Sequence, residues 1–307
     1  MHVLESLPAS GDYLVAFGKL VIGLGLVALA WWIVNVRTKT FDDHVEIVHE
    51  RNVPFILVRT GMVLGQFIAM LALVSVTTKH TRVDLLWLVC GGLGIVVVFY
   101  AIRKVLDLVL RCSLQGADAL RNTDMSSAIL QTAFYIADGL VICGALTGSA
   151  PTVKIGAIGT GIFITLGLST LVLAYWLVGM LYGLRRSVKE DDNVAAAVIL
   201  GSIIIGLGLI LRTAIAGDMS DDATGAISDY VPGVILFTIY AVIGIVVLVA
   251  LLPVLDKLVL TNVTISKMVK ERNWQPTIVM AVFVFGAALL VANIPIGVVA
   301  DVVAVTP

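Results

Sequence analysis

The stretch Asp192-Asn193-Val194-Ala195-Ala196-Ala197 joins a charged segment to a long apolar helix that continues past Gly206. Asn193 precedes Gly206 by 13 residues. The same step from Asn or Ser to Gly recurs at three other places, namely Asn52 to Gly65, Ser126 to Gly139 and Asn273 to Gly286. Because Asn and Ser side chains accept hydrogen bonds from the first free N–H groups of a helix, each copy predicts a capped helix start. One unit is therefore repeated four times.

The composition is that of a membrane protein. Of the 307 residues, 59% are hydrophobic and 13% are charged, and the mean hydropathy is +1.05. A soluble domain carries about 25% charged residues, whereas a helix that crosses a bilayer needs about 20 apolar residues. Eight such runs lie at roughly 14–36, 53–76, 84–110, 127–148, 155–182, 194–216, 231–255 and 276–300. We expect an all-α polytopic membrane protein whose eight transmembrane helices form four helical-hairpin repeats.

The repeats divide the chain near Pro151 into two halves that follow the same plan. We expect a first four-span domain at residues 1–150 and a second at residues 151–307. Each repeat is a pair of spans, so all four copies have the same orientation. Parallel repeats of this kind exclude the inverted-repeat plan of many secondary transporters, although other transporters use parallel repeats.

The distribution of basic residues predicts the orientation. Fourteen of the 20 Lys and Arg residues fall in loops that follow odd-numbered apolar runs. Cytoplasmic loops of membrane proteins carry an excess of Lys and Arg, so these loops are expected inside and both termini outside. The basic residues Lys267, Lys270 and Arg272 of one such loop are candidates for contact with anionic lipid or a protein partner.

Four polar residues stand inside the second and fourth apolar runs. Counted from the markers Asn52 and Ser126, they form two layers, with Arg59 at +7 and Gln131 at +5, then Gln66 at +14 and Asp138 at +12. The members of each layer differ in depth by only about 3 Å. An ionisable side chain in a membrane helix costs roughly 3 kcal/mol, so these side chains are expected to face the bundle. Two interpretations stay open, namely a polar pathway and buried hydrogen bonding between helices.

Small residues recur at matching places in the repeats. Gly61 and Gly65 are four residues apart in one repeat, and Ser202 and Gly206 occupy the corresponding places in another. Such pairs allow helices to approach closely. The candidates for helix packing are Gly61, Gly65, Gly139, Ser202, Gly206 and Gly286. Since the Gly-rich faces exceed what one bundle needs to bury, we also expect a homo-oligomer.

The Asn-Val-Ala-Ala-Ala marker, preceded by a basic and acidic stretch and followed by small residues, resembles the YjfL-like family of uncharacterised bacterial inner-membrane proteins. The resemblance is clearest over residues 185–217, extends to the final hairpin and weakens in the first half, where Pro54-Phe55-Ile56 replaces Ala195-Ala196-Ala197. It implies two tandem four-span domains of unknown function and a location in the bacterial plasma (inner) membrane. It also implies association with stress-related or membrane-organising partners. It supplies no catalytic residues.

The sequence favours a non-enzymatic membrane component, a scaffold or partner-binding subunit with a basic cytoplasmic face. The alternative is an ion-conducting or proton-linked channel or transporter that uses Arg59, Gln66, Gln131 and Asp138. An enzyme is disfavoured because no HExxH, GxSxG, P-loop or dinucleotide-binding motif occurs. The three Cys residues lack metal-binding spacing, so no metal or cofactor is expected. Membrane lipids and a cytoplasmic or membrane protein are the expected partners, and nucleic acid is not.

Overall fold

A computed structural model describes residues 10–37, 47, 49–75, 81–111, 124–217, 223–258 and 264–294. These residues form helices and no strand. Eight of the described helices are long and apolar enough to cross a membrane, as predicted. They are α1 (Ser10–Arg37), α2 (Val53–Ser75), α3 (Thr81–Arg111), α5 (Met125–Leu146), α6 (Val153–Leu181), α8 (Val194–Ile215), α9 (Ile227–Leu258) and α11 (Gln275–Ala292). Two short helices are α7 (Leu184–Asp191) and α10 (Ile265–Lys270).

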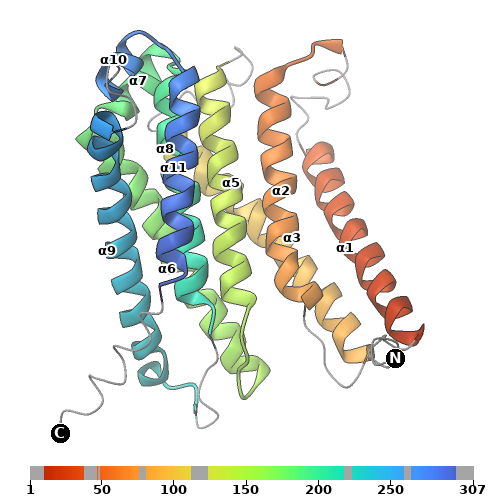
Figure 1. The fold of residues 1–307 in the computed structure, drawn as a ribbon. Coiled ribbons are helices and arrows are strands. Elements are labelled where there is room, and N and C mark those ends of the chain that lie inside the picture. The colour runs from red at the N-terminus through yellow and green to blue at the C-terminus, as the bar shows by residue number, and fades with distance from the viewer. Residues whose placement is uncertain are drawn as a thin grey trace, which may run out of the picture.

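The long helices pair into four hairpins, and the second helix of each hairpin stands in a central row. The row runs α2, α5, α8, α11, with each helix packed against the next (Figure 1). All four begin at the end of the bundle where α7 and α10 lie, so the hairpins are parallel. We call this the basic end, because α7 and α10 with the turn that follows carry Arg185, Arg186, Lys189, Lys267, Lys270 and Arg272.

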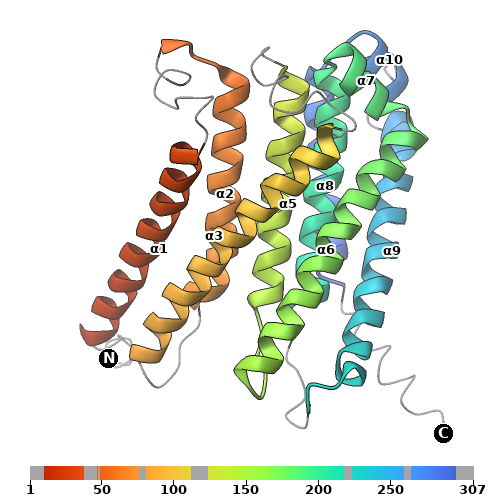
Figure 2. The same cartoon turned by 180° about the vertical axis from the view of Figure 1, so that it is seen from behind.

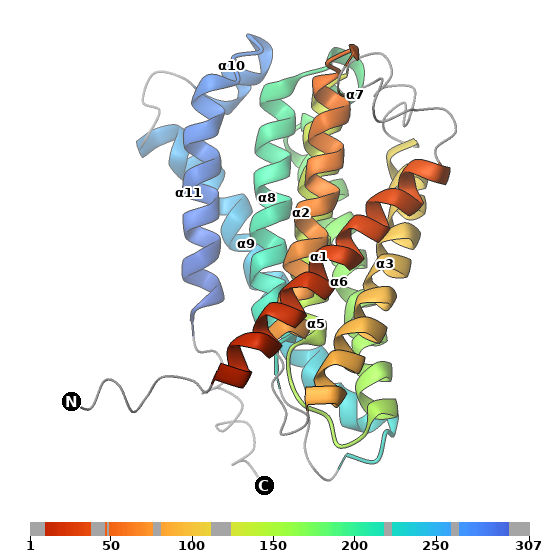
Figure 3. The same ribbon diagram turned by 90° about the vertical axis from the view of Figure 1, so that its right-hand side faces the viewer.

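The first helices of the hairpins pack against this row. Viewed from behind, α3 runs obliquely across α2 toward α5, and α6 lies beside α5 and α8 (Figure 2). Figure 3 shows α1 crossing the outer side of α2 and α3 at the far end of the molecule from α9 and α11. The middle of the row is therefore covered on all sides. This explains why 72% of the α5 span and 78% of the α8 span are buried, against 50% or less of the other spans.

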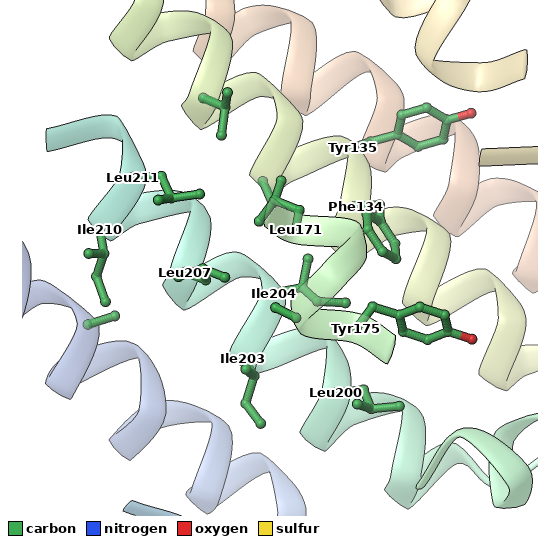
Figure 4. Close-up of a cluster of buried hydrophobic side chains, with 14 of the residues drawn as sticks. Phe134, Tyr135, Leu171, Tyr175, Leu200, Ile203, Ile204, Leu207, Ile210 and Leu211 are labelled. Atoms are coloured by element: carbon green, nitrogen blue, oxygen red, sulfur yellow. The ribbon is translucent and has the colours of Figure 1, made fainter. Parts of the chain in front are cut away.

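The core follows from the composition of α5 and α8. Both are apolar nearly all round, which is the pattern of a helix that packs on every side. Leu200 and Ile204 of α8 meet Leu171 of α6 and the α5 side chains in a continuous cluster (Figure 4). Phe134 of α5 stands edge-on to Tyr175 of α6, with ring centroids 5.7 Å apart. This geometry is the preferred one for aromatic pairs.

Glycines allow the close approach of helices in the row. A Cβ added at Gly61 of α2 would lie 2.8 Å from the Cα of Thr132 in α5, and Cβ atoms at Gly65 and Gly139 would strike the backbone of the facing helix. A Cβ at Gly206 of α8 would meet Ala288 of α11 at 3.2 Å. Gly286 differs from the predicted packing role, since no atom lies within 4 Å of its would-be Cβ. α11 is the last helix of the row, and α8 packs against a different face of it.

Ser202 and the predicted capping residues also have defined places. The Ser202 hydroxyl donates to its own helix at Ile199 O, 2.8 Å away. Asn52 and Asn193 cap α2 and α8, because their Oδ1 atoms accept from Phe55 N and Ala196 N, each at 3.1 Å. The residue before each Asn has a left-handed backbone, at Arg51 (φ 50°), Asp192 (φ 46°) and Arg272 (φ 55°). This repeated turn resembles the left-handed residue that often closes a helix.

At the other two copies the caps differ from the predicted ones. Asp124, not Ser126, caps α5, and its Oδ1 accepts from Ser127 N at 3.0 Å. Ser126 therefore lies inside the first turn. At the fourth copy Asn273 donates its N–H to Met268 O at 2.9 Å and so closes α10, while α11 begins at Gln275 without a side-chain cap.

Candidate functional site

The helix starts bring the four intramembrane polar residues into matched layers. Arg59 is the seventh residue of α2 and Gln131 the seventh of α5. Gln66 and Asp138 are the fourteenth residues of the same helices. The offset of two residues that the cap markers predicted disappears, because α5 begins at Asp124 rather than Ser126. Both pairs belong to the first half of the chain.

On α2 the polar residues face α1 and α3. The Arg59 side chain is 5% exposed, and its guanidinium lies 4.9 Å from the ring centroid of Phe55 and 5.9 Å from that of Trp31 in α1. Such contacts between a cation and aromatic faces are attractive. Gln66 is 1% exposed, and its Oε1 accepts no hydrogen bond within the described part of the chain.

Gln66 lines a small cavity between α1, α2 and α3. The cavity has a volume of about 10 Å³, and its other lining residues are Ala30, Ile33, Met62, Val96, Phe99, Tyr100 and Arg103. This is about the smallest cavity that can hold a single water molecule. A water placed there has the amide of Gln66 as a polar partner.

On α5 the polar residues share one helix face with two aromatic rings. Gln131, Phe134, Tyr135 and Asp138 follow the i, i+3, i+4, i+7 spacing of such a face. Asp138 is 2% exposed, and among the described residues its Oδ2 receives no hydrogen bond. Gln131 is also buried. A carboxyl held this way in the middle of a span is costly, so Asp138 is a candidate functional residue.

Phe99 of α3 lies over the contact between α2 and α5. Its ring lines the Gln66 cavity and stands 6.5 Å from the ring of Tyr135, stacked at an interplanar angle of 22°. Its Cε1 atom would be 3.1 Å from a Cβ added at Gly65. The ring therefore lies between the Gln66 cavity and the α5 face that carries Asp138.

A third polar layer was missed by sequence reasoning. Lys19 of α1 and Asp84 of α3 form an ion pair at 3.4 Å, and they are 5% and 3% exposed. Asp84 is the fourth residue of α3, near the end opposite the basic end. Lys19 is the ionisable side chain in the apolar middle of α1, which was the available signal for it. Asp84 offered no comparable signal, because α3 also carries Arg103 and Lys104. Their pairing depends on the packing of α1 against α3, which the sequence did not indicate.

The second half of the chain repeats the arrangement of helices but lacks these polar layers among its described residues. Among its described residues, the buried polar side chains are Asn193 and Thr277, both near helix starts at the basic end. Arg212 is half-buried in the last turn of α8. The polar content of the spans is thus concentrated in α1, α2, α3 and α5.

The residues predicted to contact lipid or a partner lie at the basic end. Lys267 pairs with Glu271 at 4.0 Å, and Arg272 pairs with Asp191 of α7 at 3.7 Å. These side chains and that of Lys270 are exposed. Within the described ranges, no three His, Cys, Asp or Glu side chains gather in a way that could hold a metal ion.

Comparisons with known proteins identify the family but no function. No curated protein and no solved structure matches the chain. A family model described as a Domain of Unknown Function (DUF350) matches twice in tandem, over residues 3–146 and 150–294. The first match holds α1 to α5 and all three polar layers, and the second holds α6 to α11. The chain is therefore a member of the DUF350 family with two tandem copies of its domain, and it is a multi-pass helical membrane protein.

Proposed function

We propose that the first domain carries a proton-linked membrane function, with Asp138 as the group that takes up and releases the proton. The observation that carries this proposal is the unbonded Oδ2 of Asp138, buried in the middle of a span. Polar residues that serve only to hold helices together would be hydrogen-bonded across the interface. Gln66 Oε1 and Thr132 Oγ1 also accept no hydrogen bond from the described residues. Solvent protons and single waters are the partners that such groups lack.

The three polar layers follow one another along the bundle, and we infer that a proton path passes them in that order. Arg59 and Gln131 lie two turns into their helices from the basic end, Gln66 and Asp138 lie two turns farther, and Lys19 and Asp84 lie near the opposite end. Because the Gln66 cavity holds about one water, the path suits a proton rather than a hydrated ion. The close glycine contacts between α2 and α5 leave no room for a wider channel along that seam.

Proton flux into liposomes tests this proposal. The purified protein is reconstituted with a pH-sensitive dye inside, and a pH gradient and a membrane potential are applied. We expect Asp138→Asn to reduce the flux by about tenfold or more, because the amide cannot exchange a proton. Glu190→Gln is the matched control, since that carboxyl is exposed at the basic end. Equal flux in the wild type and Asp138→Asn would contradict the proposal.

A second candidate is a non-enzymatic scaffold whose basic end binds a partner protein on the cytoplasmic side. It is favoured by the exposure of the basic residues on α7, on α10 and in the turn after α10, of which Arg186, Lys267 and Arg272 are each more than half exposed. Replacement of Lys267, Lys270 and Arg272 by Gln is expected to remove proteins that co-purify with the wild type from native membranes. An unchanged set of co-purifying proteins would count against this candidate, and cross-linking in the same membranes reports any homo-oligomer.

A further inference from the structure

A cavity of about 580 Å³ lies at the basic end of the second domain. It is an open pocket that is lined by the end of α6, the end of α9 and the short helices α7 and α10, which lie together in Figures 1 and 2. Its size is that of a small-molecule site. It lies at the ends of long apolar helices, where the interface between membrane and water is expected.

The walls of the cavity are held in place by hydrogen bonds within the protein. Asp256 of α9 accepts from Ile265 N at 2.7 Å and so fixes the start of α10. The amide of Asn193 donates to Val269 O and fixes the end of α10 against α8. A site that is already formed spares a ligand the cost of ordering it.

A hydrogen bond from α6 fixes the end of α9. Pro253 has no N–H, so the carbonyl of Val249, four residues earlier, loses its helical donor. The Tyr182 hydroxyl at the end of α6 donates to that carbonyl at 3.2 Å. Both Pro253 and Tyr182 line the cavity. This hydrogen bond therefore joins the end of α6 to α9 on the side of the cavity that these two helices form.

The lining has an apolar side and a charged side. The exposed Pro253 and the half-buried Val269 present apolar surface to the cavity, whereas Lys270 and Arg272 bring two positive charges. The cavity also contains two carboxylates, Asp191 and Asp256. Arg272 is paired with Asp191, and the described part of the chain offers Lys270 no ion pair. Two charges of each sign favour a zwitterionic ligand over a polyanion, and the apolar wall favours one with acyl chains.

We propose that this cavity binds a phospholipid whose head group carries both a phosphate and a primary amine. Lys270 and Arg272 contact the phosphate, for which ammonium and guanidinium groups are the usual partners. Asp256 accepts from the amine, and the acyl chains leave along the apolar wall. This assignment is narrower than general attraction of anionic lipid to a basic surface, and it does not depend on the polar layers of the first domain.

Binding of defined lipids to the full-length protein tests the assignment. The protein is titrated with phosphatidylethanolamine, phosphatidylcholine or phosphatidylglycerol and followed by native mass spectrometry. We expect phosphatidylethanolamine to bind tightest, because the choline cannot donate a hydrogen bond to Asp256 and phosphatidylglycerol has no amine. Equal affinity for the three lipids would overturn the assignment.

Two lysines at the basic end provide a matched pair of variants. Lys270→Gln is expected to weaken phosphatidylethanolamine binding about tenfold, the factor for one lost charge-assisted hydrogen bond. Lys257→Gln removes the same charge from the last turn of α9 outside the cavity lining and is expected to leave binding unchanged. Equal weakening by both variants would show nonspecific attraction and overturn the proposal. Asp256→Asn keeps the acceptor for Ile265 N, so a folded Asp256→Asn variant that loses selectivity for the amine supports the assignment.

Soluble phosphoethanolamine shows whether the cavity recognises a membrane phospholipid or a free aminophosphate with the same head group. If it displaces the lipid at comparable concentration, the head group alone is recognised and a free aminophosphate is also a ligand. If it does not, the acyl chains are part of the recognised ligand, as the apolar wall predicts. Both results keep the recognised class, whereas binding of glycerol phosphate with the same affinity as phosphoethanolamine would overturn it.

Discussion

Two aspartates meet at Ser126 and connect the two domains. The Ser126 N–H donates to Asp192 at 2.9 Å, and its hydroxyl donates to Asp124 at 2.9 Å. Burial raises the pKa of Asp192, and the neighbouring Asp124 raises it further. Burial also opposes ionisation of Asp124, but hydrogen bonds from Asp192, Ser127 and Ser126 outweigh it and lower the pKa of Asp124. Of the two carboxyls, Asp192 is therefore the one that protonates first as the pH falls.

These directions predict how stability depends on pH. Because the pKa of Asp192 is raised above 3.8, its contribution to stability falls as pH rises from 3.8 through that raised pKa. The contribution of Asp124, whose pKa is lowered, is lost only below pH 3.8. Asp192→Asn keeps an acceptor for Ser126 N and removes the ionisation. We expect thermal unfolding in detergent between about pH 4 and pH 8 to show a smaller decline in the variant than in the wild type. Parallel curves would contradict this.

The Lys19 and Asp84 pair predicts a double-mutant result. Removing one partner leaves the other charge buried, which costs about 3–5 kcal/mol. We expect Lys19→Met and Asp84→Leu each to lower the free energy of unfolding by that order, and the double variant to lose much less. Denaturant unfolding of the four proteins in the same detergent measures the coupling. Additive losses in the double variant would show that the two charges do not depend on each other.

At the scale of elements, the spans could be predicted and the caps only in part. Length and hydropathy determine where a helix crosses a membrane, so all eight spans were found. A cap is decided by which of several adjacent acceptors meets the first free N–H groups, as with Asp124 and Ser126. The spacing predicts Asn273 as the cap of α11, but its N–H donates to Met268 O and closes α10 instead. That choice depends on contacts from another element, which the local sequence does not contain.

The contact between α2 and α5 gives a prediction with an internal control. Gly65→Ala would place a methyl group against the backbone carbonyl of Tyr135, so the helices must separate. We expect a loss of about 1–3 kcal/mol, as for other overpacked sites. Gly94→Ala in α3 meets no atom within 4 Å and should be neutral or slightly stabilising. Thermal unfolding of the two variants compares them, and equal melting temperatures would refute the close-packed row.

Across the molecule, the two domains have the same arrangement of helical hairpins but differ in the polar residues within their spans. The repeat predicted the hairpins because spacing and small residues recur in each copy. It could not predict that Gly286 lies open, since this follows from α11 being the last helix of the row. Nor could it predict the contact of Arg59 with Trp31, or the ring of Phe99 between Gln66 and the Asp138 face. The first contact joins the two helices of one hairpin, whereas the place of Phe99 beside both Gln66 and Tyr135 depends on how two hairpins pack. Both depend on which helix faces meet, and the local sequence does not contain that information.

The first domain therefore carries polar layers within its spans, whereas the spans of the second domain are apolar in their described middle parts. The second domain holds α8 in the row on one side and the basic end with its cavity on the other. A membrane protein that kept three polar layers in one copy of a repeat and none in the other would be expected to use the first copy for charge movement. We therefore expect the carboxyl of Asp138 to exchange protons with the solution.

Infrared difference spectroscopy on oriented proteoliposomes tests whether the Asp138 carboxyl gains and loses a proton. The pH is changed on one side of the membrane and then on the other, and the carboxyl C=O band is followed in the wild type and in Asp138→Asn. The account predicts a band that responds to pH, shifts on transfer to heavy water and is absent from Asp138→Asn. A spectrum of the wild type identical to that of Asp138→Asn under every pH change would contradict it, and Asp138 would then be a buried structural residue.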